Sequence, residues 1–166
     1  MSVTDTHIGL ISTKEEETAH LGHLLGMACR AGDCITLEGD LGTGKTVLCR
    51  GFIQAAAGSA VDVTSPTFTL VQIYETRHGV PLWHMDFYRL ENKDEVMETG
   101  LEEALEHAMT LIEWPQVAST FLPHDRLQVR LTHGKEGDVR TISLQGNATR
   151  WQACLSDIME AYERNR

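Results

Sequence analysis

The chain has 166 residues and a hydrophobic content of 42%, which suffices for one buried core and argues against disorder. Its formal net charge is -10 at pH 7, with a pI near 5.2. Binding of DNA or RNA needs clustered Lys and Arg to neutralise the phosphates, so this net negative charge argues against direct nucleic-acid binding. Any role with RNA would then require a partner.

Cysteine usage and the N-terminal composition predict a cytoplasmic protein. The four cysteines form no C-x-x-C pair, and two lie in segments expected to be buried, which favours reduced thiols over disulfides or zinc. The acidic stretch 14–17 stands where a signal peptide would carry an apolar core. No run approaches the ~18 apolar residues of a membrane span. No internal repeat or long linker appears, so residues 1–166 are expected to form one domain.

The first elements lead into a Gly-rich loop. Residues 8–11 predict a short strand, and Ser12 to Glu15 match a capping box that would open a helix. Apolar residues then recur at helical spacing until Gly32, which offers a stop. The apolar run 34–37 predicts the strand that precedes the loop.

Residues 39–46, GDLGTGKT, fit the phosphate-binding pattern G-x-x-x-x-G-K-[ST] at every fixed position. Glycines let the backbone curl until successive N–H groups face the phosphates. Lys45 can then reach the β and γ phosphates, the Thr46 hydroxyl can ligate Mg²⁺, and the helix beginning near Gly44 adds its positive dipole end. The pattern therefore predicts a site for a nucleoside triphosphate.

The rest of the chain predicts helices alternating with strands, and two hairpins. The expected elements are a helix over 44–57, strands over 69–74 and 80–87, an acidic helical stretch over 91–107 broken at Thr99-Gly100, a buried strand over 109–112, strands over 127–131 and 139–144, and a final helix over about 149–164. This order predicts an α/β fold of the P-loop NTPase type, with a mixed sheet flanked by helices in a single domain.

Two carboxylates follow apolar strands. Asp86 ends the run 81–85 and Glu113 ends the run 109–112, and ligands of open α/β sheets bind at the carboxyl ends of strands. One carboxylate could hold the metal and the other could orient the attacking water, and the sequence leaves open which does which. His84 lies two residues before Asp86, so we expect it on the same face and able to tune or orient that carboxylate.

Thr67 lies 21 positions after Thr46, where many phosphate-loop proteins place a switch that senses the γ-phosphate. An ordinary Ser-Pro-Thr turn, with hydroxyls that cap backbone groups, is an equally good interpretation. Residues 92–95, NKDE, resemble the guanine-reading motif N-K-x-D but carry Glu at the fourth position, and are expected to start a helix. No D-x-x-G follows Thr67, which disfavours a regulatory GTPase.

Three further side chains have competing interpretations. His20 and His23 are spaced as two metal ligands on one helix face, but a solvated face is favoured because no third ligand is evident. Trp114 could pack in the core or cover the site, and core packing is favoured.

Four segments, residues 37–46, 65–71, 84–90 and 112–115, occur in an order that resembles the TsaE family. Members of that family are small bacterial ATPases needed to make threonylcarbamoyladenosine in tRNA. The resemblance runs from about Ser12 to Leu144. It implies an ATP-binding subunit that acts with a TsaD-type transferase and its TsaB-type paralogue and resets their complex between turnovers. tRNA is expected to be met through that complex, and the sequence leaves open whether it also contacts this subunit.

The resemblance also implies roles for individual residues. Thr46 and Glu113 would hold Mg²⁺, Asp86 would support hydrolysis together with Lys45, and Thr67 would be the switch residue. The nucleotide phosphates would be held by the loop residues Leu41, Gly42, Thr43, Gly44, Lys45 and Thr46. Further nucleotide contacts implied by the resemblance are Glu15 and Arg140. Thr43 stands where alanine is common in the family.

Two other functions remain open on the sequence. A small-molecule kinase would transfer the γ-phosphoryl group to an acceptor, but such enzymes carry an arginine-rich lid and the chain has no such stretch. A nucleotide-gated interaction module with negligible chemistry overlaps the ATPase interpretation.

Overall fold

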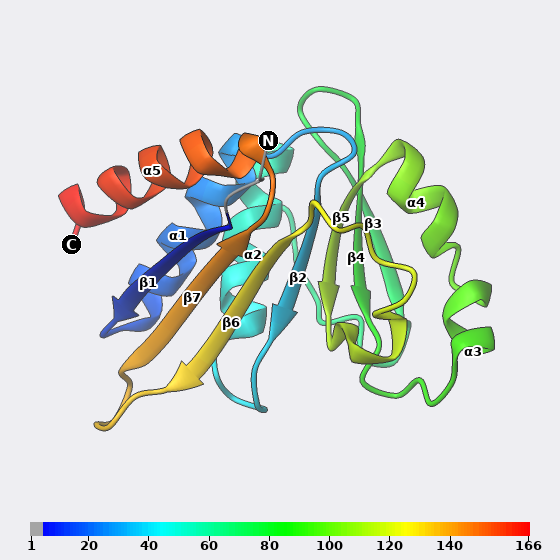
Figure 1. Ribbon diagram of the computed structural model, residues 1–166, viewed down its shortest axis with the longest axis horizontal. Helices are drawn as coiled ribbons and strands as arrows, with labels where there is room; N and C mark the ends of the chain where they lie inside the picture. Colours follow the sequence, from blue (N-terminus) through cyan, green and yellow to red (C-terminus); the bar gives the residue numbers. More distant parts are fainter. Residues whose placement is uncertain (1–4) are drawn as a thin grey trace.

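The fold, seen in a computed structural model that describes residues 5–166, is built on one mixed seven-stranded sheet with the order β1-β7-β6-β2-β5-β4-β3 (Figure 1). The strands are β1 (Thr6–Ser12), β2 (Cys34–Glu38), β3 (Val71–Glu75), β4 (Pro81–Asp86), β5 (Met109–Glu113), β6 (Leu127–His133) and β7 (Arg140–Gly146). The helices are α1 (Glu15–Ala28), α2 (Lys45–Ala57), α3 (Lys93–Glu98), α4 (Leu101–His107), η1 (Pro115–Ala118) and α5 (Thr149–Arg164).

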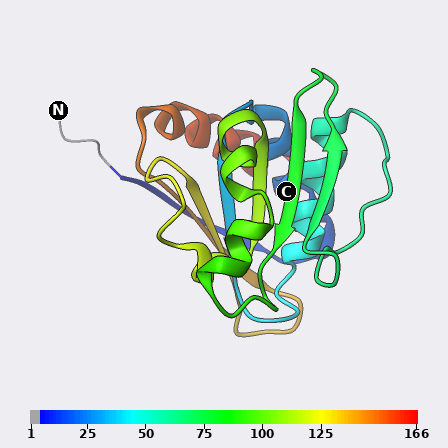
Figure 2. The same ribbon diagram turned by 90° about the vertical axis from the view of Figure 1, so that its right-hand side faces the viewer.

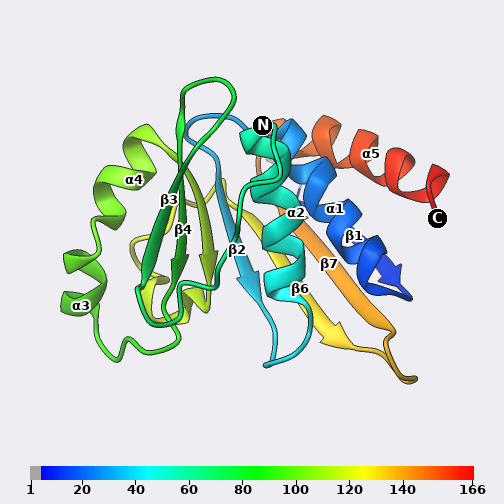
Figure 3. The same ribbon diagram turned by 180° about the vertical axis from the view of Figure 1, so that it is seen from behind.

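Helices cover both faces of the sheet, which confirms the α/β class. α1, α2 and α5 lie together on one face, where they close the larger apolar core around Leu37, Phe52 and Trp151 (Figure 3). α3, α4 and η1 pack on the other face around a smaller core that includes Met85 and Ile112 (Figure 2). The central parts of strands β2, β4 and β5 are therefore buried on both sides, which explains their largely apolar sequences.

The central strands end at one edge of the sheet. β2 pairs in parallel with β5 and β6, and β4 pairs in parallel with β5. Register places Asp86 opposite Glu113 and Glu113 opposite Leu37. Because the Gly-rich loop follows β2 directly, both strand-end carboxylates lie beside it.

Both predicted hairpins are confirmed: β3 pairs with β4 and β6 pairs with β7, each antiparallel. The helical stretch breaks where expected, between α3 and α4, with Gly100 in the left-handed region at φ +85°. Asn92 caps α3 by accepting from the Glu95 N–H at 3.0 Å, so residues 92–95 do start a helix.

The capping box expected at the start of α1 is wrong. β1 extends through Ser12, so the helix begins only at Glu15, and Ser12 Oγ donates to the Lys14 carbonyl instead. The carboxylate that reaches back belongs to Glu17, which accepts from the Thr13 N–H at 2.7 Å. Gly32 does not end the helix either, since α1 stops at Ala28 and Gly32 lies in the turn before β2.

Helices α1 and α2 approach so closely that their contact requires glycine. A Cβ on Gly51 of α2 would lie 2.2 Å from the Ala19 carbonyl oxygen of α1. Gly22 and Gly26 are equally tight against α2, since a Cβ on either would lie within 2.3 Å of a backbone oxygen. The close approach fixes how α2, and therefore the loop before it, sits on the sheet.

We expect Gly51→Ala to lower the free energy of unfolding by about 1–3 kcal/mol, because the clash with Ala19 outweighs the better helix propensity of alanine. Urea denaturation measures the loss. Gly9→Ala in β1 is the control, since a Cβ there meets nothing within 4 Å. Equal stability of the Gly51 variant and the native chain would contradict the role assigned to this contact.

Within residues 5–166, none of the helices combines the length and apolar character that a membrane span needs. The four cysteines, which all lie in this range, are free thiols, as predicted, and three of them are buried.

Candidate nucleotide-binding site

The Gly-rich loop connects β2 to the first residue of α2. Gly42 and Gly44 adopt left-handed backbone angles, with φ of +79° and +99°, which glycine tolerates at little cost. Thr43 Oγ1 donates to the Asp40 carbonyl at 2.9 Å and tightens the turn. The loop therefore delivers the N-terminus of a 13-residue helix, with its unpaired N–H groups, to the sheet edge.

Lys45 is buried at the start of α2 with its side chain turned back over the loop. Its ammonium donates to the carbonyls of Gly39 and Asp40. Burial lowers the pKa of Lys45, while the charges of Glu113 and Asp86 act in the opposite direction. The two acids thus favour the charged form of the one lysine in the loop.

Two adjoining cavities flank the loop. The first, which we call the carboxylate cavity, has a volume of about 300 Å³ and reaches the ends of β4 and β5. It brings together eight of the site residues expected from the sequence: Leu41, Gly42, Gly44, Lys45, Thr46, Thr67, Asp86 and Glu113. The second, which we call the α1 cavity, has a volume of about 340 Å³ and shares Gly42, Gly44 and Val47 with the first.

Asp86 and Glu113 are nearly inaccessible, at 2% and 3% exposure, yet both line the carboxylate cavity. Asp86 accepts from the Tyr88 N–H at 2.9 Å and from the Thr67 hydroxyl at 3.0 Å. Burial raises the pKa of Asp86, with a smaller contribution from the nearby charge of Glu113. A carboxylate whose pKa is raised in a cavity is a candidate proton acceptor.

His84 contacts Glu113 rather than the carboxylate expected from the sequence. Its Nε2 lies 2.8 Å from Glu113 Oε2, and both side chains are buried. The orienting contact expected with Asp86 is therefore made with Glu113 instead, whereas the expected tuning is confirmed, since burial raises the pKa of Asp86 and the charge of His84 acts in the opposite direction. The parallel pairing of β4 and β5 places Glu113 across from the end of β4, within reach of the His84 ring, which spacing along one strand could not reveal.

Thr67 lines the carboxylate cavity. Its hydroxyl donates a hydrogen bond to Asp86 and lies 2.8 Å from Ser65 Oγ. The alternative of a plain turn, with hydroxyls that cap backbone groups, does not describe these contacts. Phe68, the next residue, is 77% exposed and lies under the Arg89 guanidinium.

Trp114 forms a wall of the carboxylate cavity, so the preference for core packing is wrong. It is half-buried, with a left-handed backbone (φ +55°) that turns the chain sharply after Glu113. The Lys45 Nζ lies 4.4 Å from its ring centroid, and the Tyr88 ring lies 4.8 Å away. Its position directly after a strand-end carboxylate was the signal in the sequence.

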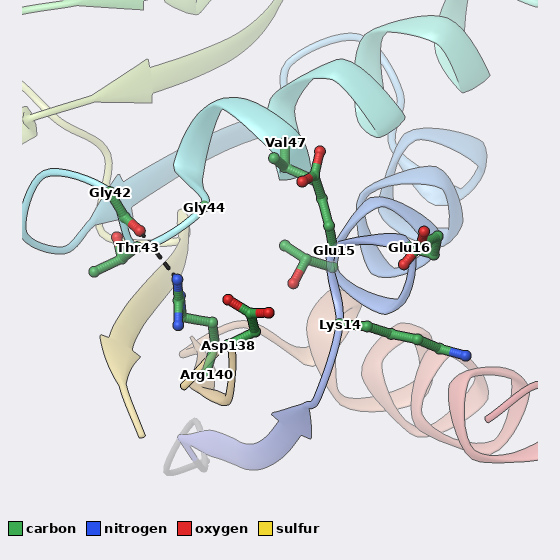
Figure 4. Close-up of a pocket in the computed structure, with 10 residues that line it drawn as sticks. Lys14, Glu15, Glu16, Gly42, Thr43, Gly44, Val47, Asp138 and Arg140 are labelled. Atoms are coloured by element: carbon green, nitrogen blue, oxygen red, sulfur yellow. Dashed lines mark hydrogen bonds between the residues drawn. The ribbon is translucent and has the colours of Figure 1, made fainter. Parts of the chain in front are cut away.

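The α1 cavity brings together Glu15, Thr43 and Arg140, the other residues expected at the site (Figure 4). Arg140 begins β7, and its guanidinium donates to the Gly42 carbonyl at 3.3 Å. Asp138 and Lys14 also line this cavity and were missed by the sequence analysis. Asp138 lies in a hairpin loop and Lys14 in the segment interpreted as a capping box, and neither pattern indicates a nucleotide contact.

The interpretation favoured for His20 and His23, a solvated helix face, holds for His23, which is exposed, whereas His20 is half-buried. The rings of His20 and His23 stack with their centroids 6.4 Å apart, and His23 is exposed, while His20 also stacks on Tyr162. One group among residues 5–166 has the spacing of metal ligands: Cys49, His84 and Glu113.

The residues at the loop fit a nucleoside triphosphate with Mg²⁺. Thr46 and Glu113, which both line the carboxylate cavity, offer the hard oxygen ligands that this cation prefers. A Cβ on Gly42 would project into open space that both cavities share. The chain therefore leaves free the volume that a backbone cradle for phosphates requires.

Comparisons with known proteins identify a family for this chain. A family model described as "Threonylcarbamoyl adenosine biosynthesis protein TsaE" matches residues 12–142. The tRNA threonylcarbamoyladenosine biosynthesis protein TsaE of Rickettsia felis is 40% identical over 92% of this chain and 86% of its own length. The protein of the same name from Bacillus subtilis is 35% identical over 86% of this chain and 88% of its own length.

A solved structure shares the fold. The crystal structure of Bacillus subtilis YdiB superposes with a TM-score of 0.79, at 28% sequence identity, over 95% of this chain and 97% of that chain. The family match covers most of the chain, including the loop, both carboxylates and Arg140. The chain therefore belongs to the TsaE family.

Proposed function

We propose that this protein is a Mg²⁺-dependent ATPase of tRNA threonylcarbamoyladenosine synthesis. The observation that carries the proposal is the meeting of Lys45 and Thr46, from the phosphate loop, with Asp86 and Glu113 around one cavity. A phosphate cradle alone binds nucleotide. The added buried carboxylates supply what hydrolysis needs, namely a metal ligand and a group that positions water.

Each residue then has a defined task. Lys45 and the N–H groups of the loop would hold the β and γ phosphates, and Thr46 with Glu113 would hold the cation. Mg²⁺ bound there would neutralise negative charge on the phosphates. Asp86 orients the attacking water and accepts its proton, a task that suits its raised pKa. Thr67, hydrogen-bonded to Asp86, is placed to respond to the γ-phosphate.

The α1 cavity would take the nucleoside. It opens from the same glycines that flank the phosphates, so base and ribose can enter it while the triphosphate stays on the loop. Arg140 and Glu15, on opposite walls, supply polar contacts (Figure 4). We propose ATP as the nucleotide.

The partners follow from family membership and charge. Relatives at 35–40% identity are named for tRNA threonylcarbamoyladenosine biosynthesis. With a net charge of -10, this chain is poorly suited to bind tRNA directly. We therefore propose that it acts on a TsaD-type transferase and a TsaB-type paralogue, resets their complex between turnovers, and meets tRNA only through them, in the cytoplasm.

A small-molecule kinase is the competing function, and the fate of the γ-phosphate distinguishes the two. Arg140 is the one arginine in the linings of the two cavities, as far as residues 5–166 go, which does not favour a lid of several arginines. Incubation with γ-labelled ATP should release inorganic phosphate whether or not metabolite mixtures are added. Label on a small-molecule acceptor would instead identify a kinase.

Glu113→Ala should weaken nucleotide binding at least tenfold in Mg²⁺ and little in EDTA, because the variant removes a cation ligand and no phosphate contact. Titration with a fluorescent ATP analogue, with and without Mg²⁺, measures both constants. Glu103→Ala, which removes an exposed carboxylate from α4, is the matched control. Equal losses in the two buffers would remove Glu113 from the metal shell.

A further inference from the structure

His84 is a fully buried titratable side chain with no role in the mechanism above. It lies on β4, two residues before Asp86, and has 0% exposure. Its Nε2 lies 2.8 Å from Glu113 Oε2. Its Nδ1 is buried and, within residues 5–166, has no hydrogen-bond partner. The ring is therefore held in place for the contact with Glu113.

An apolar side chain would fill this position at lower cost. Leaving a polar nitrogen buried without a partner costs about 1–3 kcal/mol. β4 and β5 lie side by side in the sheet (Figure 1), and the ring spans from one strand to the carboxylate at the end of the other. A carboxylate oxygen accepts, so Nε2 carries the proton and donates to Oε2, which leaves Oε1 of Glu113 for another partner.

We propose that His84 is a positioning residue that fixes the Glu113 carboxylate for Mg²⁺. The inference rests on the proposed function, in which Glu113 is a cation ligand. A glutamate side chain has several rotatable bonds, and a donor on one oxygen selects the orientation in which the other oxygen faces the cavity. Ligating side chains are commonly held by such outer partners, whose loss weakens metal binding about 10–100-fold.

A zinc site formed by the same residues is less consistent with the geometry. Cys49, His84 and Glu113 have potential ligand atoms within 4.8 Å of one another, and this donor set suits Zn²⁺. Two ligand atoms on a tetrahedral Zn²⁺, with bonds of about 2.0–2.1 Å, lie about 3.3 Å apart. The separation of 2.8 Å between Nε2 and Oε2 is that of a direct hydrogen bond.

The test compares variants of His84 in the full chain. His84→Leu removes the donor and keeps an apolar side chain of similar size, whereas His84→Gln keeps an N–H donor near the position of Nε2. Cys49→Ala, which trims the same cluster without touching the hydrogen bond, is the matched control. A fluorescent ATP analogue is titrated at increasing Mg²⁺ concentrations. The two readouts are the Mg²⁺ concentration at which half of the gain in affinity for the analogue is reached, and the affinity for the analogue in EDTA.

His84→Leu should raise the half-maximal Mg²⁺ concentration tenfold or more and leave the affinity in EDTA unchanged. His84→Gln should recover most of the loss, and Cys49→Ala should match the native chain. A folded His84→Leu with the native Mg²⁺ requirement would overturn the proposal. So would one equivalent of zinc in the purified native protein that is lost in both the His84→Leu and Cys49→Ala variants.

If His84→Leu does not fold, His84→Asn replaces it, because its amide ends short of the position of Nε2. The Asn variant should need more Mg²⁺ than the Gln variant, and equal requirements would overturn the proposal. Failure of the proposed function gives a different result: Glu113→Ala itself would then leave the Mg²⁺ dependence unchanged.

Discussion

Lys45→Ala should raise the dissociation constant for ATP about a hundredfold. In the proposed function the ammonium is the cation that reaches the β and γ phosphates, and its charge-assisted hydrogen bonds would contribute about 3 kcal/mol to binding. The backbone N–H groups of the loop remain, so binding weakens without vanishing. Equilibrium titration with a fluorescent ATP analogue in Mg²⁺ measures the change.

Two controls make this result specific. Lys93→Ala removes an exposed lysine at the start of α3 and should bind ATP as the native chain does. Thermal unfolding without nucleotide tests the fold, because Lys45 also donates to the Gly39 and Asp40 carbonyls. A folded Lys45 variant with native affinity would show that the loop does not hold the phosphates.

Asp86→Asn should leave ATP binding within a few-fold of native and lower the turnover number about 10²–10⁴-fold. Asparagine has nearly the same shape, and its carbonyl oxygen can still accept from the Tyr88 N–H. It cannot take a proton from water. Steady-state kinetics separates the two effects, and a variant that lost affinity but kept its turnover number would assign Asp86 to binding instead.

The stability of this variant provides an independent check. Burial raises the pKa of Asp86, so the folded state holds the proton more tightly than the unfolded state does. Below the ordinary pKa, Asp86 is protonated in both states and does not lower the free energy of unfolding. As the pH rises through the raised pKa of the folded state, Asp86 must ionise in its buried position, and the free energy of unfolding falls. Without nucleotide, Asp86→Asn should melt higher than the native chain at pH 8, and this advantage should shrink toward pH 4.

Structural features that are determined by a short stretch of sequence could be predicted. The phosphate loop is an eight-residue pattern whose backbone does the binding, and both hairpins are marked by turn residues between alternating runs. The break at Thr99-Gly100 follows from one glycine that adopts a positive φ. Both strand-end carboxylates were found because each follows a recognisable apolar run. The four ordered motifs then identified the family.

Features that depend on long-range pairing were not predictable from local patterns. β1 pairs with β7, which places Ser12 opposite Arg140, and the sequence contains no signal for that register. The contact between His84 and Glu113 likewise needs the pairing of β4 with β5. Trp114 reaches the cavity because of a left-handed backbone that its residue type disfavours. The start of α1 was misplaced because β1 continues through Ser12.

We propose that this chain hydrolyses ATP as one subunit of a tRNA-modifying complex. The most direct test is Mg²⁺-dependent ATP turnover by the purified chain, alone and with a TsaB and TsaD pair, with Lys45→Ala as control. We expect slow turnover alone, stimulation by the pair, and loss of both in the variant. Turnover that the pair does not change, or that the variant retains, would contradict the account.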